Sequence, residues 1–295
     1  DVPVLAGSIG PTSLAETKAF FQDGPTNAAV VIKAVAGGGG RGMRVVRRFE
    51  EVEEAYSRCQ SEARAAFGNS DVYVERFMPA ARHIEIQILG DHSGSVAHLW
   101  ERECTVQRRH QKLIEIAPSP SLTPTTRDQL IAAALRMAQQ VKYDSLGTFE
   151  FLVDTNDAAN ATFAFIEANP RLQVEHTVTE EVTGVDLVKT QLQLAFGRSI
   201  QELGLDARRL EKPRGFAIEL RVNAESMAED ASVRPSNGTL TVFEAPSGPG
   251  LRVDSYAYAG YSTNPRFDSL LAKLIVHSPS PDFAETVNKA YRALC

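Results

Sequence analysis

Cysteine is scarce in this chain of 295 residues, which holds only Cys59, Cys104 and Cys295. The three cysteines show no CxxC spacing and form an odd set, which argues against both a disulfide framework and a zinc site. A protein without structural disulfides belongs in a reducing compartment, and we expect the cytoplasm. The cysteines are then expected to serve as small apolar side chains.

Long apolar runs are missing as well. No stretch approaches the ~20 consecutive apolar residues of a membrane-spanning helix, and the first residues show no signal-peptide pattern. The chain begins without Met, and its end at residues 291–295 interrupts an amphipathic helical pattern. We therefore expect a part of a longer polypeptide that does not bind a membrane.

An excess of positive charge is also absent. The sequence has 31 Lys and Arg against 37 Asp and Glu, which gives a net charge of -6. This balance argues against a nucleic-acid surface but leaves room for a local basic pocket that binds phosphates. Hydrophobic residues make up 43% of the chain, enough for a sizeable core in one large or two smaller domains.

The first 77 residues predict a small α+β unit. Apolar, β-branched runs at 30–34, 43–46 and 72–77 predict strands, and the pattern over 50–66 predicts a surface helix. The glycine-rich residues 37–42 lie between the first two strands. We expect them to interrupt the strand and to form a mobile tip without bound nucleotide.

The central part of the chain predicts three further strands. Alternating isoleucines predict a half-buried strand over 83–89. The apolar runs 148–153 and 163–168 predict two neighbouring antiparallel strands, joined by a polar turn at 154–160.

Helices and a change of character complete the pattern. Pro124 fits the first turn of a helix that runs to about residue 142, and Thr183 is expected to cap a helix that runs to about residue 196. From residue 213 onward, short apolar runs between Gly, Pro, Ser and Asn predict a mostly β domain. Its expected strands are 216–222, 238–243, 251–253 and 271–277.

Lys33 shortly precedes a run of glycines that can approach phosphates. Gly38, Gly39, Gly40 and Gly42 lack Cβ, so that their backbone N–H groups can lie close to a polyphosphate. The run is not a P-loop, because no Gly-Lys-Ser/Thr follows it. Taken alone, the glycines are equally compatible with a flexible hairpin tip.

Two glutamates inside apolar strands suggest a metal site. Glu150 and Glu167 are each flanked by phenylalanine, isoleucine or alanine, where a lone charge would be costly. Asn169 lies two residues after Glu167, on the same face of the strand. Such oxygen ligands suit Mg²⁺ with substrate phosphates. Charges that point outward from an edge strand are the alternative.

Three further features carry charge near these residues. Arg171 offers a planar fork that matches carboxylate or bicarbonate, and Glu175 could act as a general base. Arg221 lies inside an expected strand and needs an anion or a carboxylate there. Residues 107–112 are dense in hydrogen-bond donors. A solvated basic turn and a surface salt bridge are the alternatives for these clusters.

Together these residues resemble the biotin carboxylase family, within the ATP-grasp superfamily. The resemblance covers nearly the whole chain, and the run from Arg171 to His176 is highly specific for this family. The matching segments are Lys33–Met43, Arg82–Gln87, Gln107–Lys112, Gly147–Phe151, Asn169–His176, Arg221–Glu225 and Phe267–Leu270.

The resemblance implies an α+β chain with an ATP-grasp fold. We expect a glycine-loop lid in residues 1–77, the main ATP-grasp domain in 78–212 and a mostly β biotin carboxylase C-terminal domain in 213–295. The family also has an N-terminal Rossmann-like domain, which we expect to be largely absent here, together with the end of the C-terminal domain. One lysine that the family uses for ATP is then missing, so the chain can be inactive alone.

The resemblance also implies the roles of individual residues. Lys33 and Lys112 would contact the phosphates of ATP, and Glu150, Glu167 and Asn169 would hold Mg²⁺ or Mn²⁺. Further residues implied at the nucleotide are Gly38, Gly39, Gly40, Gly42, Met43, Glu75, Met78, His83, Gln107, His110 and Leu152. Those implied at bicarbonate are Arg171, Gln173, Val174 and Glu175.

The implied reaction makes carboxybiotin from ATP, bicarbonate and biotin. Glu175 would deprotonate bicarbonate, which attacks the γ-phosphate. The resulting carboxyphosphate would release CO₂, and the released phosphate would take the proton from biotin. Arg221 would stabilise the biotin anion, and Lys112 is expected to be catalytic as well. Cations are thus expected where negative charge develops.

The implied partners are a biotin carboxyl carrier domain, which brings the biotin, and a carboxyltransferase domain. A homo-oligomer is implied for the full-length enzyme, and a mitochondrial matrix location for a eukaryotic source. Residues 176–187 resemble both pyruvate carboxylases and single-chain acyl-CoA carboxylases, whereas 245–250 resemble the acyl-CoA type. We therefore expect an acyl-CoA acceptor, with pyruvate as the alternative.

Two other functions compete with this one. Another bicarbonate-using ATP-grasp ligase, such as carbamoyl-phosphate synthetase, is disfavoured by the run from Gln173 to His176. A catalytically incomplete nucleotide-binding fragment is the second alternative.

Overall fold

The computed structural model describes residues 2–25, 28–38, 41–155, 161–206, 209–229 and 232–295. The chain divides into two compact units. Unit 1 comprises Asp1–His83, Gln107–Gln111 and Phe151–Glu167, and unit 2 comprises Ile84–Val106, Lys112–Glu150 and Ala168–Cys295. The domain boundaries expected at residues 77 and 212 stay a prediction.

A three-stranded antiparallel sheet forms the centre of unit 1. Its strand order is β2-β1-β3, with β1 (Val30–Gly38), β2 (Arg41–Val46) and β3 (Val72–Arg76). The three strands expected in this part of the chain are confirmed. Their alternating valines and isoleucines place one apolar face inward, as strand geometry requires.

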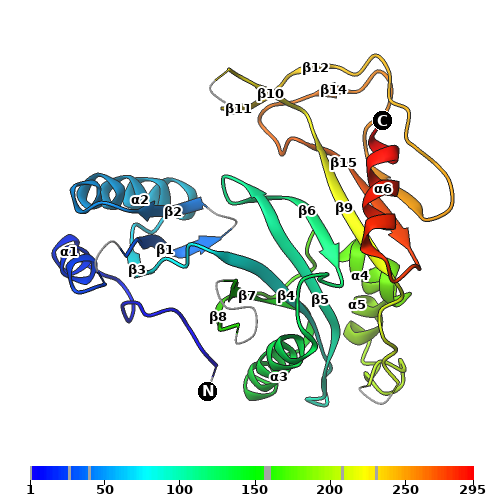
Figure 1. Cartoon of the computed structure of the whole chain (residues 1–295), viewed down its shortest axis with the longest axis horizontal. Helices are drawn as coiled ribbons and strands as arrows, with labels where there is room; N and C mark the ends of the chain where they lie inside the picture. Colours follow the sequence, from blue (N-terminus) through cyan, green and yellow to red (C-terminus); the bar gives the residue numbers. More distant parts are fainter. Residues whose placement is uncertain (1, 26–27, 39–40, 156–160, 207–208, 230–231) are drawn as a thin grey trace. The chain divides into compact units, whose positions relative to one another are not determined.

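Two helices and a short 3₁₀ turn complete this unit (Figure 1). They are α1 (Leu14–Gln22), η1 (Phe49–Glu51) and α2 (Val52–Phe67). The Ser13 side chain caps the start of α1, and Gly68 ends α2 in the left-handed conformation. Cys59 on α2 is fully buried in the apolar core of the unit, as expected of a small apolar side chain, whereas Cys295 is exposed.

The glycine run differs in part from expectation. We expected residues 37–42 to interrupt the strand, but β1 continues to Gly38 and β2 begins at Arg41. The register shifts between the Lys33–Met43 pair and the Gly38–Arg41 pair, so the irregularity lies within the paired strands. Gly39 and Gly40, where we expected the mobile tip, lie outside the described residues.

An eight-stranded sheet forms most of unit 2, in the order β13-β15-β9-β6-β5-β4-β7-β8. The parts of β4 to β8 that fall in residues 81–83, 107–111 and 151–167 belong to unit 1. In chain order the strands are β4 (Ala81–Gly90), β5 (Val96–Arg108), β6 (Gln111–Ala117), β7 (Ser145–Asp154), β8 (Phe163–Asn169), β9 (Phe216–Asn223), β13 (Leu251–Ser255) and β15 (Leu270–Ser278).

Helices cover both faces of this sheet in unit 2 (Figure 1). Glu101 and Arg102 are successive residues of β5 and so point to opposite faces. Glu101 contacts Arg127 of α3 (Pro124–Gln140), whereas Arg102 contacts Thr179 of α4 (His176–Thr183). The sheet is therefore enclosed between α3 on one side and α4 on the other.

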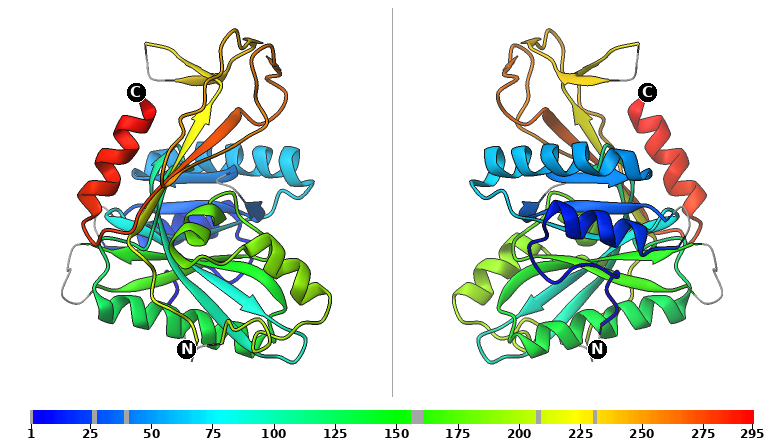
Figure 2. Two further views of the ribbon diagram at one scale, coloured as in Figure 1. Left: turned by 90° about the vertical axis from the view of Figure 1, so that its right-hand side faces the viewer. Right: turned by 90° about the vertical axis from the view of Figure 1, so that its left-hand side faces the viewer.

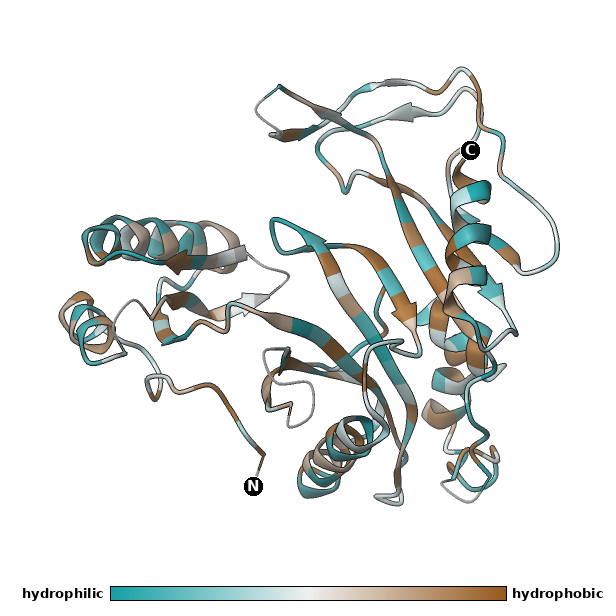
Figure 3. Cartoon of the chain, viewed as in Figure 1, coloured by the Kyte–Doolittle hydropathy of each residue, from teal (hydrophilic) through white to brown (hydrophobic). Residues whose placement is uncertain are grey.

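The two-sided burial overturns one expectation. Strand 83–89 was expected to be half-buried, but Glu85 is 0% and Gln87 is 1% exposed, like the isoleucines between them. Figure 3 shows hydrophilic and hydrophobic bands alternating along β4 and β5. Because helices cover both faces, the polar bands are buried as well as the apolar ones.

The helix expected from Thr183 to about residue 196 is confirmed at its end, but its expected start at Thr183 is wrong. Thr183 is the last residue of α4, which Gly184 ends in the left-handed conformation. A second helix, α5 (Leu187–Ala195), starts after Asp186, whose side chain accepts the backbone N–H of Lys189. Among the described residues, no helix has both the length and the apolar character needed to cross a membrane.

The last part of the chain is mostly β, as expected. Small two-stranded pairs join β10 (Glu225–Met227) with β11 (Val233–Pro235), and β12 (Gly238–Thr239) with β14 (Ser262–Thr263). The strand expected over 238–243 is thus confirmed for two residues only. Helix α6 (Phe283–Leu294) packs its apolar side against β9 and β15 (Figures 1 and 2).

Candidate active site

Four charged side chains lie on four adjacent strands of the large sheet. In the order β6-β5-β4-β7 they are Lys112, Arg102, Glu85 and Glu150. Arg102 and Glu85 are fully buried, and Glu150 is 3% exposed. A buried charge is costly unless opposite charges and hydrogen bonds accompany it. The partners of these groups therefore show how the buried charges are compensated.

Lys112 donates to three carboxylates. Its Nζ lies 2.6 Å from Glu85 Oε2, 2.6 Å from Glu175 Oε1 and 3.3 Å from Glu150 Oε1. Burial alone would lower the pKa of Lys112, but the surrounding acidic groups, Glu85 foremost, outweigh burial and raise this pKa. Lys112 is therefore a permanent positive charge at neutral pH.

Glu175 links Lys112 to a second cation. The Glu175 side chain is 1% exposed and lies at the N-terminus of α4. Its Oε2 accepts from Nη2 of Arg221 at 3.0 Å, and Nε of Arg221 donates to Glu115 Oε1 at 2.7 Å. Arg221, which we expected to need an anion or carboxylate, has two. The result is a buried chain of alternating charge, Lys112–Glu175–Arg221–Glu115.

Arg102 fixes the other side of Lys112. Its Nε forms an ion pair with Glu85, and Nη1 donates to Gln87 Oε1 at 2.8 Å and to Thr179 Oγ1 at 2.9 Å. Its Nη2 donates to Thr148 Oγ1 at 3.1 Å. The planar, many-donor guanidinium suits such a divided set of acceptors. Arg102 thereby holds Glu85 where that carboxylate can contact Lys112.

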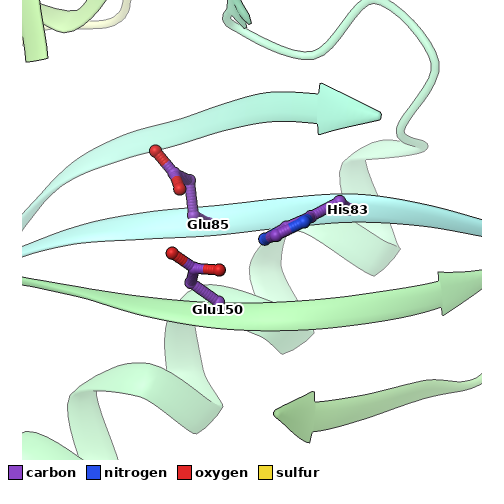
Figure 4. A group of neighbouring side chains, drawn as sticks. All are labelled: His83, Glu85 and Glu150. Carbon is purple, nitrogen blue, oxygen red and sulfur yellow. The ribbon is translucent and has the colours of Figure 1, made fainter. Parts of the chain in front are cut away.

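The expected metal ligands offer hard oxygen donors. Figure 4 shows Glu85 and Glu150 on the adjacent strands β4 and β7, with His83 two residues from Glu85. Asn169 Nδ2 donates to Glu150 Oε1 at 2.9 Å, and Glu167 lies on β8, the neighbour of β7. Carboxylate and carboxamide oxygens suit Mg²⁺ or Mn²⁺. The donor set fits such an ion, and convergence of Glu167 with Glu150 stays a prediction.

The loop between β8 and α4 presents the expected bicarbonate ligands. Arg171 is exposed, and its Nη1 donates to Oε1 of the buried Gln173 at 3.1 Å. The carbonyl of Val174 accepts from Lys273 Nζ at 2.8 Å. These contacts hold the backbone directly before Glu175 in place, while the guanidinium of Arg171 stays on the exposed side.

Apart from Lys112, the expected nucleotide ligands fall in unit 1. Lys33 on β1 forms an ion pair with Glu75 on β3 and is the register partner of Met43 on β2. Met78 and Leu152 are half-buried. Lys33, Glu75 and Met43 thus share one small sheet, and their contact with a nucleotide stays a prediction. Gly42 takes a left-handed φ of 66°.

Residues 107–112 lie in a β-hairpin, in which the turn is confined to Arg109 and His110. The side-chain Nε2 of Gln107 lies 2.8 Å from Nδ1 of His83. Arg109 and His110 have φ of 52° and 64° and form the two-residue connection between β5 and β6. Two left-handed residues are the geometry that tight hairpins prefer. Gln107, Arg108 and Lys112 are thus half-buried at the ends of the strands, whereas Arg109 and His110 form an exposed turn, and a binding role for the cluster stays a prediction.

Two family models together match most of the chain. A family described as carbamoyl-phosphate synthase L chain, ATP binding domain, matches residues 1–203. The biotin carboxylase C-terminal domain family matches residues 219–295, and this second match separates the chain from other ATP-grasp ligases. The chain belongs to the biotin carboxylase family. Its α+β, ATP-grasp architecture agrees with that expected from the sequence.

Similar proteins are multidomain carboxylases. Pyruvate carboxylase of Aspergillus niger is 45% identical over 295 residues, covering 100% of this chain and 24% of that protein. Mitochondrial pyruvate carboxylase of Homo sapiens is 47% identical over 295 residues, covering 99% of this chain and 24% of that protein. This biotin carboxylase chain thus spans about a quarter of the length of these relatives.

A solved structure shows the same fold with ligands. The biotin carboxylase domain dimer of Hydrogenobacter thermophilus 2-oxoglutarate carboxylase, in complex with MgADP, ADP and bicarbonate, has a TM-score of 0.90 and 40% identity. The match covers 99% of this chain and 62% of that chain. The similarity therefore extends over both units of the present biotin carboxylase chain.

Three buried charged residues that contact Lys112, Glu85 or Arg221 were not among the candidate site residues. Glu85, Arg102 and Glu115 each lie in a strand and are almost completely buried. The available signal was a charged residue within an apolar strand, which had identified Glu150 and Arg221. Applied to Glu85, that signal would have added the partner of Lys112.

Proposed function

We propose that the chain is the biotin carboxylase part of a biotin-dependent carboxylase, a ligase that forms carboxybiotin from ATP, bicarbonate and biotin. The observation that supports this most is the position of Glu175 between Lys112 and Arg221, 2.6 Å and 3.0 Å away. A base, flanked by two cations, suits a reaction that passes through the anions carboxyphosphate, phosphate and deprotonated biotin.

The proposed reaction converts ATP, bicarbonate and biotin into ADP, phosphate and carboxybiotin, and the proton that Glu175 takes up is released to water at the end of the cycle. Glu175 takes the proton of bicarbonate, whose oxygen attacks the γ-phosphorus of ATP, and ADP leaves. The carboxyphosphate formed breaks down to CO₂ and phosphate. The phosphate takes the N–H proton of biotin, and the biotin nitrogen attacks CO₂. Arg221 stabilises the biotin anion, Lys112 the phosphoryl oxygens, and Arg171 orients bicarbonate.

Glu150, Glu167 and Asn169 would hold Mg²⁺ or Mn²⁺ in this proposal. The bound ion would supply positive charge to the phosphates of ATP. The nucleotide itself would lie against Lys33, Glu75 and the glycine run of the lid. Glu150 also balances part of the charge of Lys112, 3.3 Å away, until substrates arrive.

The test is phosphate release from ATP by the full-length protein and by this chain alone. Release that requires both bicarbonate and free biotin supports the proposal. ATP binding without such release in the full-length protein would instead show a nucleotide-binding module. Release by the full-length protein only would show that this chain needs the segments outside it.

Glu167→Gln tests the metal site. Loss of one ionic ligand should raise the Mg²⁺ concentration needed for half-maximal ATP hydrolysis by about tenfold or more. The same substitution at Glu202, which is exposed and, among the described residues, contacts its neighbours Arg198 and Ser199, should leave this concentration unchanged. A Mg²⁺ dependence that is equal in both variants would remove Glu167 from the site.

For the wider enzyme we propose a biotin carboxyl carrier domain and a carboxyltransferase domain as partners, a homo-oligomer, and a cytoplasmic or mitochondrial matrix location. Similarity to the pyruvate carboxylases of A. niger and H. sapiens supports pyruvate as the acceptor. The acyl-CoA acceptor expected from residues 245–250 is the alternative. Carboxylation of acetyl-CoA or propionyl-CoA, without carboxylation of pyruvate, by the full-length protein would overturn the proposal.

A further inference from the structure

Two buried glutamates face each other beside Arg221. Glu115 on β6 and Glu219 on β9 are direct register partners in the antiparallel pair, and both are 0% exposed. Residues opposite each other in this way point to the same face, with Cβ atoms about 5 Å apart. Two carboxylates in this position repel each other strongly away from water.

Each glutamate uses one oxygen and leaves the other without a donor. Glu115 Oε1 accepts from Arg221, whereas Glu219 Oε2 accepts from the Thr177 hydroxyl and lies 3.8 Å from Lys273 Nζ. Within the described part of the chain, no hydrogen-bond partner reaches Glu115 Oε2 or Glu219 Oε1, and both atoms are buried. Buried acceptors without a donor are rare.

The charges around the pair call for a proton. The charged groups that face it are Arg221 on β9, Lys273 on β15 and Glu175 at the start of α4. Glu175 also pairs with Lys112, which links this group to Glu85, Glu150 and Arg102. With both glutamates ionised, five carboxylates in this connected set would face four cations, Lys112, Arg102, Arg221 and Lys273. Burial raises the pKa of Glu115 and of Glu219 above the ordinary value of a glutamate, although Arg221 and Lys273 act in the opposite direction.

We propose that Glu115 and Glu219 share one proton, which is carried by Glu219 and donated to Glu115, and that this pair positions Arg221. This inference rests on the function proposed for Arg221. The proton lies on Glu219 because Arg221 holds Glu115 at 2.7 Å and so favours its ionised form. A pair with a single negative charge aligns the guanidinium and opposes its positive charge less than two ionised glutamates would. Both glutamates are positioning residues.

Glu219→Gln is the decisive variant, because an amide N–H of the same shape replaces the proposed O–H donor. In the wild type, the raised pKa stabilises the fold below the ordinary glutamate pKa of 4.5, and this contribution is lost as the pH rises through the folded value. The amide of the glutamine does not titrate, so its N–H donor is present at every pH. Its melting temperature should therefore rise relative to wild type by about 2–4 °C between about pH 5 and pH 9.

Two comparison variants make the result specific. Glu115→Gln removes the carboxylate that aligns Arg221, and should lower kcat by about tenfold with little change in the KM for ATP. Glu219→Gln keeps a donor toward Glu115 and should lower kcat by less than Glu115→Gln does. Glu101→Gln, at a buried glutamate that pairs with Arg127 on the other face, should lose stability at every pH.

Infrared spectroscopy detects the proton without turnover. The carbonyl stretch of a protonated carboxyl group should be present in the wild type at neutral pH and absent from Glu219→Gln. Absence of this band from the wild type would overturn the proposal, as would equal kcat losses in Glu115→Gln and Glu219→Gln. If the band is found but bicarbonate-dependent ATP hydrolysis is not, the shared proton stands and the proposed function fails.

Discussion

Glu175→Gln should reduce bicarbonate-dependent turnover by about 10²–10⁴-fold while ATP still binds. The amide cannot take the proton of bicarbonate. It also removes the negative charge that Lys112 and Arg221 share at 2.6 Å and 3.0 Å, so the two cations lose their common partner. Phosphate release with bicarbonate and biotin measures turnover, and calorimetric titration with ATP measures whether ATP still binds.

Arg171→Ala is the companion variant, and it should likewise keep ATP binding and lose bicarbonate-dependent release. Glu181→Gln is the matched control. Glu181 lies in the same helix as the backbone that follows Glu175, and its contact is with Arg252 at 3.6 Å, away from Lys112. Its turnover should equal that of the wild type. An equal loss of ATP affinity in the Glu175 and Arg171 variants would place these residues at the nucleotide instead of at bicarbonate.

Local patterns predicted most of the strands because they report on nearest neighbours along the chain. The runs at 30–34, 72–77 and 271–277 all form strands, since alternating β-branched residues need little beyond one apolar face. Helix boundaries were less accessible. Thr183 and Asp186 are both good capping residues, and only the left-handed turn at Gly184 decides in favour of Asp186.

The site could be predicted only in part for a related reason. The resemblance supplied Lys112 and Glu175, whose contacts the structure brings together. Glu85 was missed because alternation with isoleucine is typical of a strand with one solvent-exposed face. Burial of that second face depends on α4, which follows much later in the chain. Arg102 is needed there because a buried Glu85 requires an opposite charge.

Arg102→Leu should lower the free energy of unfolding by about 3–5 kcal/mol, the typical cost of removing one partner from a buried ion pair. Arg102 and Glu85 both have 0% exposed side chains. The leucine leaves Glu85 without the guanidinium that neutralises it. It also removes the hydrogen bonds that Arg102 donates to Gln87, Thr148 and Thr179. Urea denaturation monitored by circular dichroism measures the loss.

Two controls separate the buried ion pair from a general effect of losing an arginine. Arg198→Leu breaks an exposed i,i+4 pair with Glu202 and should change the free energy of unfolding by less than about 0.5 kcal/mol. Arg102→Lys keeps the charge but not the fork of donors, and should fall between wild type and leucine. If Arg102→Leu costs no more than Arg198→Leu, then Lys112 alone compensates Glu85. The proposed role of Arg102 in holding Glu85 against Lys112 would then be wrong, because the carboxylate would not need the guanidinium to stay in place.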